Sequence, residues 1–530
     1  MSAPKERTAD WTDERGTSGE GRRRARALRR RNASTAEKLA DAVLIPPFPG
    51  PHAPRWVLDA LERGLAGVTI FGPNIAGPEQ LAALTAQLRR AGGRPLVAID
   101  EEGGDVTRID HLTGSPYPGN AALGAVGDVA LTMAVHRALG QDLAELGITV
   151  DLAPSVDVNI ASDNPVIGIR SFGSDPARVA RHAAAAVSGL QAAGVAACAK
   201  HFPGHGSTSA DTHHRVVTVG AGLDTLRRRD LVPFAAAIAA GVRGVMPGHL
   251  RVPELTSELP ATLSAAAQTG LLRGELGFTG VIISDALEMR AVSGVYGLPG
   301  AAVRAVAAGT DLLCLGRDTG QDGYLAVRGA LAEALASGRL PAARLEDAGR
   351  SVARLHGWLA GQAGVRAAGD GAAGDGAAAR AERAGIGLAA ARRAIRVSAP
   401  PHPLADPVVL QLGAPENIAV GSVPWGLAPW VPASRLQRAP ASLADGETVA
   451  VIDAALAGSH GRPLVVVVRD AHRHPAARAV VTGLLAARPD AVVVDMGLPY
   501  WQPPGGLHLS TYGAARASAQ AAAELLGLTR

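Results

Sequence analysis

The fifteen residues from Lys200 to His214, K-H-F-P-G-H-G-S-T-S-A-D-T-H-H, hold the densest group of acid/base side chains in the chain. Pro203, Gly204 and Gly206 disfavour a helix here, so we expect a loop. Six of its side chains are polar or titratable: Lys200, His201, His205, Asp211, His213 and His214. A carboxylate such as Asp211 can fix the tautomer of a nearby imidazole and raise its basicity. The other ring nitrogen of His213 is then left to give or take a proton.

A second reactive group is expected at Asp285, which directly follows Ser284 and the apolar run Val281–Ile283. A carboxylate held at the end of a buried strand can act as a nucleophile or stabilise a cation. A carboxylate nucleophile with a separate acid/base is the arrangement of retaining glycosidases, although their usual acid is a second carboxylate.

Short apolar runs precede most of these groups and indicate buried parallel strands. Ala/Leu/Arg-rich segments of helical period separate them, for example 177–193 and 225–240. This alternation predicts a (β/α)8 TIM-like barrel over residues 36–360. An open doubly wound sheet is the alternative, but no G-x-G-x-x-G follows the first run. The eight runs are Val43–Ile45, Val68–Phe71, Leu96–Ile99, Ile148–Leu152, Val195–Ala199, Gly244–Met246, Val281–Ile283 and Leu312–Leu315.

Polar residues follow several of these runs, at the point where each strand is expected to end. They include Asp100 with Arg108, Asp157, Arg170 and His249. All strands of a parallel barrel end at one rim, so we expect these side chains to share a pocket.

The last third of the chain indicates a smaller α/β sandwich domain at residues 385–530. Residues 361–384 are rich in Gly, Ala and Asp and predict a flexible linker. Strands are expected at Val408–Leu412, Thr448–Ile452, Leu464–Val468 and Ala491–Val494. The densest ionisable cluster of this domain, Arg469–His474, is expected to lie mostly at the surface.

Charge and cysteine content narrow the class of protein. The net charge is +4, and residues 1–32 contribute ten Lys/Arg against five Asp/Glu. We therefore expect residues 1–35 to be a disordered basic tail, with polyanion binding as an alternative, and no nucleic-acid partner for the rest. Cys198 and Cys314 lie in apolar runs and are expected to be buried thiols. Since no apolar N-terminal segment is seen, we expect a cytoplasmic enzyme without membrane contact. We also expect a monomer.

Several long motifs resemble glycoside hydrolase family three, in particular its β-N-acetylglucosaminidase branch. They are K-H-F-P-G-H-G with D-T-H, D-E-E-G-G-D-V-T-R, N-P-V-I-G-I-R-S-F-G, P-A-T-L-S and S-D-A-L-E-M. The resemblance covers residues 38–350 closely. Residues of the C-terminal part, R-D-A-H-R-H, V-D-M-G-L-P and T-Y-G-A, are similar to the second domain of two-domain members.

The resemblance implies a role for each matching residue. Asp285 would be the nucleophile of a covalent glycosyl-enzyme, His213 the general acid/base, and Asp211 the group that polarises His213. Sugar hydroxyls and the N-acetyl group would be bound by Asp100, Arg108, Arg170, Lys200 and His201, with His249 a weaker candidate. Ala286 after the nucleophile, where β-glucosidases of the family usually have Trp, favours the aminosugar branch. The implied activity is release of terminal N-acetylglucosamine from chitin or peptidoglycan fragments, without a cofactor.

Four alternatives stay open at this point. Phosphate could replace water as the acceptor, which would make the enzyme a phosphorylase, and a β-glucosidase-type hydrolase is the second. A metallohydrolase is disfavoured because the histidine spacing matches neither H-x-H nor H-E-x-x-H. A non-enzymatic sugar-binding protein would lack the nucleophile or the dyad. One departure from the family pattern is Asp105, which stands where relatives often carry Arg and is expected to alter an outer subsite.

Overall fold

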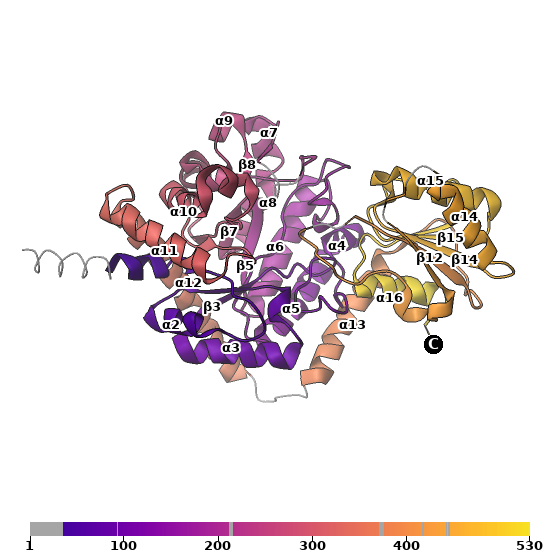
Figure 1. Ribbon diagram of the computed structural model, residues 1–530, viewed down its shortest axis with the longest axis horizontal. Helices are drawn as coiled ribbons and strands as arrows, with labels where there is room; N and C mark the ends of the chain where they lie inside the picture. Colours follow the sequence, from indigo (N-terminus) through magenta and orange to yellow (C-terminus); the bar gives the residue numbers. More distant parts are fainter. Residues whose placement is uncertain are drawn as a thin grey trace, which may run out of the picture.

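The structure, a computed structural model, describes residues 35–92, 94–210, 216–369, 376–415, 418–440, 442–443 and 446–529. It contains a parallel barrel followed by a second sheet domain (Figure 1). The basic tail expected at residues 1–35 lies outside the described residues, apart from residue 35.

All eight expected barrel strands are present, within a few residues of their expected ends. Six form one parallel sheet in the order β2-β3-β4-β5-β7-β9. β9 joins β10 through the Ile283–Leu312 bridge, β10 pairs in parallel with β1, and Thr69 N–H donates to the Pro46 carbonyl at 3.2 Å to connect β2 with the β1 end. The ring of strands is thereby closed. The strands are β1 Leu44–Ile45, β2 Gly67–Ile70, β3 Leu96–Ile99, β4 Val150–Asp151, β5 Ala196–Phe202, β7 Gly244–Pro247, β9 Val281–Ile282 and β10 Leu313–Cys314.

Helices cover the outside of this barrel, so both faces of each strand are buried, which explains the apolar runs of the sequence. Helix α6 shows how the chain sets its limits: Asp175 caps it by accepting from Ala177 N–H, and Pro176 occupies the first position. The segment expected as one helix at 225–240 is two helices, because the backbone leaves the helical region at Arg229. The main barrel helices are α2 Arg55–Arg63, α3 Pro78–Gly92, α4 Asn120–Val126, α5 Val129–Glu145, α6 Pro176–Ala192, α7 Leu223–Arg228, α8 Leu231–Ala239, α10 Arg290–Ala308, α11 Gly320–Ala336 and α12 Ala342–Gly369.

By length and composition alone, helix α10 is long and apolar enough to cross a membrane. Its buried alanines pack in the barrel core, and Gly297 interrupts its helical geometry. It is a barrel helix in this structure.

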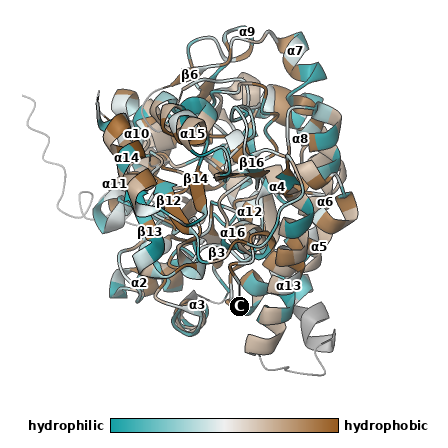
Figure 2. Cartoon of the chain, turned by 90° about the vertical axis from the view of Figure 1, so that its right-hand side faces the viewer, coloured by the Kyte–Doolittle hydropathy of each residue, from teal (hydrophilic) through white to brown (hydrophobic). Residues whose placement is uncertain are grey.

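The second domain is a six-stranded sheet in the order β11-β16-β15-β14-β12-β13, with only β11 antiparallel to its neighbour. The central strands β12 and β14 are largely hydrophobic and lie among helices (Figure 2). The strand expected at Thr448–Ile452 is wrong, because these residues lie in helix α14. The elements are β11 Arg396–Val397, β12 Val408–Leu412, β13 Leu436–Ala439, α14 Glu447–Gly458, β14 Leu464–Val468, α15 Pro475–Ala487, β15 Val492–Asp495, β16 Leu507–Ser510 and α16 Arg516–Leu525.

The segment expected as a flexible linker, 361–384, is helical at both ends. Helix α12 continues to Gly369, and α13 (Gly376–Ala394) begins again after the undescribed residues 370–375. Alanine is the strongest helix former, and α13 gains further support by packing on α4, α5 and α16. Arg383 anchors it through Asp142 of α5 at 2.6 Å. The expectation of a fully flexible segment is wrong here, whereas the domain boundaries drawn from the sequence stay predictions.

Candidate active site

A cavity of about 700 Å³ opens at the carboxyl ends of the barrel strands. Its wall includes six of the residues singled out in the sequence: Asp100, Arg108, Arg170, Lys200, His201 and Asp285. This volume lies within the range of pockets that bind small molecules. The barrel thus brings together side chains that are up to 185 positions apart in the sequence (Asp100 and Asp285).

Lys200 is the central cation of the site. It lies near the C-terminal end of strand β5 and forms ion pairs with Asp100 and, at 2.7 Å, with Glu102, while its side chain is only 3% exposed. Burial alone would lower the pKa of Lys200, but the Asp100 and Glu102 carboxylates outweigh it and raise the pKa above its ordinary value. Lys200 is therefore a fixed ammonium group that can donate to sugar hydroxyls.

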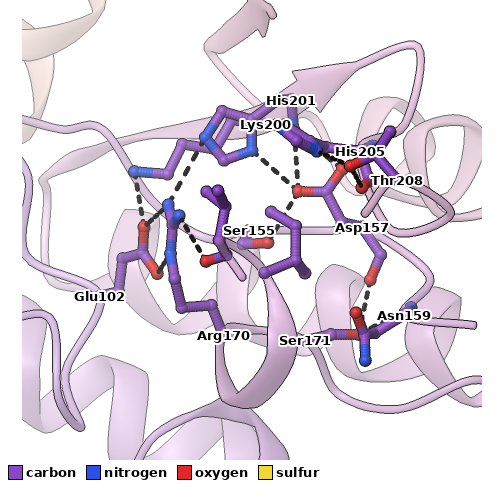
Figure 3. A network of polar contacts seen from close by, with 12 residues as sticks. Glu102, Ser155, Asp157, Asn159, Arg170, Ser171, Lys200, His201, His205 and Thr208 are labelled. Atoms are coloured by element: carbon purple, nitrogen blue, oxygen red, sulfur yellow. Dashed lines mark hydrogen bonds and ion pairs between the residues drawn. The ribbon is translucent and has the colours of Figure 1, made fainter. Parts of the chain in front are cut away.

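Glu102 pairs with both Arg170 and Lys200 (Figure 3), and it does not line the pocket itself. Arg170 Nε and Nη2 reach the two Glu102 oxygens at 2.9 and 2.6 Å, a two-point fork. Burial acts to raise the pKa of Glu102, yet the Arg170 and Lys200 charges prevail and keep it below its ordinary value. Both cations are thus oriented by one buried carboxylate.

His201 is oriented by Asp157, a fully buried carboxylate in the loop that follows β4. Nδ1 of His201 lies 2.8 Å from Asp157 Oδ2, and Arg170 Nη2 lies 3.5 Å from His201 Nε2 (Figure 3). Burial pushes the pKa of Asp157 up, but the contacts with His201 and His205 bring it below its ordinary value. A carboxylate on one side and a guanidinium on the other fit an imidazole with its proton on Nδ1.

Asp285 follows β9 and lies in the pocket wall, where one of its oxygens accepts the Ala286 N–H at 2.8 Å. His249 is fully buried and does not line the pocket. Its Nε2 lies 3.0 Å from the Ala286 carbonyl and its Nδ1 lies 2.8 Å from Thr262 Oγ1. A carbonyl only accepts, so His249 carries its proton on Nε2. The structure thus differs from the expected sugar contact: His249 holds the turn that presents Asp285.

The proposed proton-transfer residues Asp211 and His213 lie outside the described residues, as does His214. The segment leading to them is anchored by His205, whose Nδ1 lies 2.7 Å from Thr208 Oγ1. Burial lowers the pKa of His205 to about 4, so the ring is neutral near pH 7. No group of His, Cys, Asp and Glu suited to a metal ion occurs among the residues that the structure describes.

Some residues of the site were not expected from the sequence. Glu102 orients Lys200 and Arg170 from behind the pocket wall, and Glu288 lines the pocket three positions after Asp285. Asp157, which was expected to share the pocket, instead orients His201 without lining the pocket itself. Burial raises the pKa of Glu288, and one of its oxygens accepts the Gly316 N–H at 2.7 Å. The D-E-E-G-G motif was the available signal for Glu102, and the S-D-A-L-E-M motif was the available signal for Glu288.

The second domain also contributes to the pocket wall, through residues 418–423. The expectation that Arg469–His474 lies mostly at the surface is wrong for its first residue, since Arg469 pairs with Asp105 of the barrel at 2.8 Å. His472 likewise contacts the Ser162 carbonyl of the barrel at 2.9 Å. Asp105 lies in this domain interface and does not line the large pocket, in contrast to the expected outer subsite.

Comparison with known proteins agrees with this geometry. Residues 53–355 match the Glycosyl hydrolase family 3 N terminal domain. Beta-hexosaminidase LpqI of Mycobacterium tuberculosis (strain ATCC 25618 / H37Rv) is 43% identical over 273 residues, which are 50% of this chain and 69% of that protein. Beta-hexosaminidase A of Pseudoalteromonas piscicida is 37% identical over 270 residues, 47% of this chain. The matched part spans only 45% of that relative's length.

The whole architecture also has a counterpart among solved structures. A glycoside hydrolase family 3 beta-N-acetylglucosaminidase from Paenibacillus sp. str. FPU-7 superimposes with a TM-score of 0.80 at 31% identity. The superposition covers 93% of this chain and 96% of that chain, so it includes both sheet domains. The expected fold class, a TIM-like barrel followed by a smaller α/β domain, is confirmed.

Proposed function

The chain belongs to glycosyl hydrolase family 3, and from this membership we propose that it is a retaining exo-β-N-acetylglucosaminidase. The observation that carries the proposal is that Asp285 and the cations Lys200, Arg170 and Arg108 line the same pocket. Such a set can hold one polar sugar ring by its hydroxyls while a carboxylate stands ready to attack it.

The reaction follows a double displacement. An Asp285 oxygen bonds to the anomeric carbon as the glycosidic bond breaks, and the leaving oxygen takes a proton from His213. Water then gives a proton to His213 and attacks the anomeric carbon, which releases Asp285 as a carboxylate. Two inversions retain the configuration. The Ala286 N–H and the buried His249 support this role, because they fix the turn that carries Asp285.

The substrate we propose is a short oligosaccharide from chitin or peptidoglycan with a terminal N-acetylglucosamine. Charged groups concentrated on one side of a pocket favour removal of a single terminal sugar, since a long polymer cleft would need stacking aromatic residues. Aromatic residues make up only 3% of the chain. A site that hydrogen-bonds the acetamido group leaves polar atoms unpaired with glucose, and this discriminates against plain glucosides.

We also propose that the enzyme works as a monomer in the cytoplasm, as expected from the sequence. Both cysteines, Cys198 and Cys314, are buried and unpaired, which suits a reducing compartment. Cell fractionation and sedimentation of the purified protein test these two points. Recovery of the protein in the extracellular fraction, or a dimer at micromolar concentration, would contradict them.

The central experiment compares the wild type with Asp285→Asn on a chromogenic N-acetyl-β-glucosaminide. Turnover should fall by about 10⁴-fold or more, because the amide cannot form the glycosyl ester. A fluorinated slow substrate should label Asp285 of the wild type, detected by mass spectrometry. Labelling of another carboxylate, an inverted product by NMR, or faster cleavage of glucosides would each overturn the proposal. Formation of a sugar 1-phosphate in phosphate buffer would show that phosphate, and not water, is the acceptor.

A further inference from the structure

The loop from Asp100 to Asp110, which follows β3, belongs to both the pocket and the domain interface. Asp100 and Arg108 line the pocket, whereas Asp105 between them is buried against the second domain. Glu101 ties the loop together: its Oε2 accepts from Thr107 Oγ1 at 3.1 Å and from the Arg108 N–H at 2.6 Å. A displacement at Asp105 is therefore transmitted to Arg108, three positions away.

Arg108 itself is shared between the two domains. Its Nη2 donates to Asp100 Oδ2 at 3.1 Å and to the Ala419 carbonyl at 2.7 Å, and its Nη1 donates to the Val420 carbonyl at 3.3 Å. Two of these three acceptors are backbone atoms of the second domain. The direction in which the guanidinium faces the pocket is thus set by the position of residues 419–420.

Arg469 of the second domain contacts both this loop and Trp425, which lies five positions after Val420. Its Nη2 is 2.8 Å from Asp105 Oδ2, and its guanidinium carbon is 5.9 Å from the centre of the Trp425 ring. Asp105 Oδ1 also accepts the Ala514 N–H at 2.7 Å. Arg469 and Asp105 are only 12% and 2% exposed, so water does not substitute for their contact.

We propose that Arg469 is a positioning residue for sugar binding: by joining Asp105 to Trp425 it holds Arg108 in its orientation toward the bound sugar. The proposal rests on the pocket being the sugar site proposed above. Arg469 does not line the pocket and takes no part in proton transfer. The second domain thereby completes the sugar-binding set without supplying a reacting group.

The kinetic consequence follows from where Arg108 acts. A residue that binds sugar hydroxyls contributes to the ground state and the transition state alike, so its misplacement raises KM and leaves kcat nearly unchanged. A merely structural role for Arg469 would lower thermal stability and leave KM as it was. The two readings are therefore separable by kinetics on folded protein.

The experiment measures KM, kcat and Tm for Arg469→Met, Arg469→Lys and a matched control, Arg488→Met. Arg488 pairs with Asp490 at 2.8 Å in the second domain, shortly before β15 begins. Arg469 follows the C-terminal end of the neighbouring parallel strand β14, so the two arginines lie at opposite ends of these strands. We expect about a tenfold higher KM for Arg469→Met, with kcat within about twofold of the wild type, and partial recovery in Arg469→Lys. Arg488→Met should leave both constants unchanged.

A second variant, Asp105→Asn, removes the charge but keeps an oxygen for the Ala514 N–H, so it should reproduce the KM effect of Arg469→Met. An unchanged KM in folded Arg469→Met, or a fall in kcat at constant KM, would overturn the proposal. If Arg469→Met does not fold, Asp105→Asn decides alone. KM is taken on whichever glycoside of a panel the wild type cleaves, so an incorrect sugar assignment does not affect this test.

Discussion

At the scale of single residues, the site depends on buried carboxylates that orient the pocket residues without lining the pocket themselves. Glu102 compensates Lys200 and Arg170, and Asp157 fixes His201. Such groups are costly to bury and useful only while their partners are present, because an unpaired buried charge loses several kcal/mol of solvation. The same side chains therefore contribute both to sugar binding and to the stability of the fold.

Glu102→Gln tests this directly. The amide removes one negative charge between two buried cations, so we expect the free energy of unfolding to fall by about 3 kcal/mol and the KM to rise. Urea unfolding and steady-state kinetics measure the two effects. Glu333→Gln, which changes an exposed carboxylate paired with Arg339, should cost less than about 0.5 kcal/mol. Equal effects of the two variants would contradict the role of Glu102.

At the scale of elements, the pair of helices α5 and α6 supports the segment that carries Arg170. His136 and His182 enclose the ring of Phe172, with ring centres 6.1 and 5.4 Å away. Thr132 links them, since its carbonyl lies 2.9 Å from His136 Nδ1 and its hydroxyl lies 2.8 Å from His182 Nδ1. Phe172 is two positions after Arg170, so this buried cluster fixes the backbone next to a pocket residue.

Acid should loosen this cluster before it affects the carboxylates of the site. Burial lowers the pKa of His136 to about 4, whereas an unfolded histidine titrates near 6.5. Between these values the unfolded chain binds the extra proton, so stability falls as the pH drops from about 6.5 to 4, by about 3 kcal/mol for His136. Urea unfolding at several pH values should show this slope, and it should be smaller in His136→Gln. An identical slope in both proteins would contradict the assignment.

Most barrel strands could be predicted from the sequence, whereas some elements of the second domain could not. The barrel strands were predictable because each is buried on both faces and therefore reads as a short apolar run. Thr448–Ile452 (T-V-A-V-I) is similarly rich in β-branched residues but lies in α14, since so short a run does not distinguish a strand from the first turns of a helix. The Gly/Ala-rich segment around α13 was misjudged because composition does not report packing against α4 and α5.

Within the site, motifs and strand ends identified most of the residues that line the pocket, but not which residues act from behind it. Asp100, Lys200 and Asp285 lie within three residues of the C-terminal end of a barrel strand, where the strands share one rim. His249 also follows a strand, yet it turns toward the Ala286 carbonyl. The partner of Asp105, Arg469, is 364 positions away in another domain, and no local pattern could connect them.

At the scale of the whole molecule, the second domain is docked by polar contacts along one side of the barrel (Figure 1). We predict that a chain ending at Ala394, which keeps α13 on the barrel, retains the reacting groups and loses sugar affinity. With a substrate that has a good leaving group, kcat should stay within about tenfold of the full chain, while KM rises.

The contrary outcome would be equally informative. If the shortened chain keeps its circular-dichroism spectrum but shows no turnover at saturating substrate, a residue of the second domain must act in the chemistry. Labelling by the fluorinated substrate distinguishes the cases, because it needs Asp285 and the barrel part of the sugar site, but no reacting group beyond Ala394. Full labelling with a weaker affinity is the expected result.

The scarcity of lysine allows the protein to be attached to a support through few amino groups. The chain contains three lysines, Lys5, Lys38 and Lys200, against 49 arginines. Lys200 is buried and held as an ammonium ion, so amine-directed reagents should leave it unmodified at neutral pH. Lys38 is exposed on a helix over 35–41, next to the end of the barrel where the strands begin. Coupling through amines should therefore attach the enzyme to a support from its N-terminal side, with the mouth of the pocket turned outward and open to substrate.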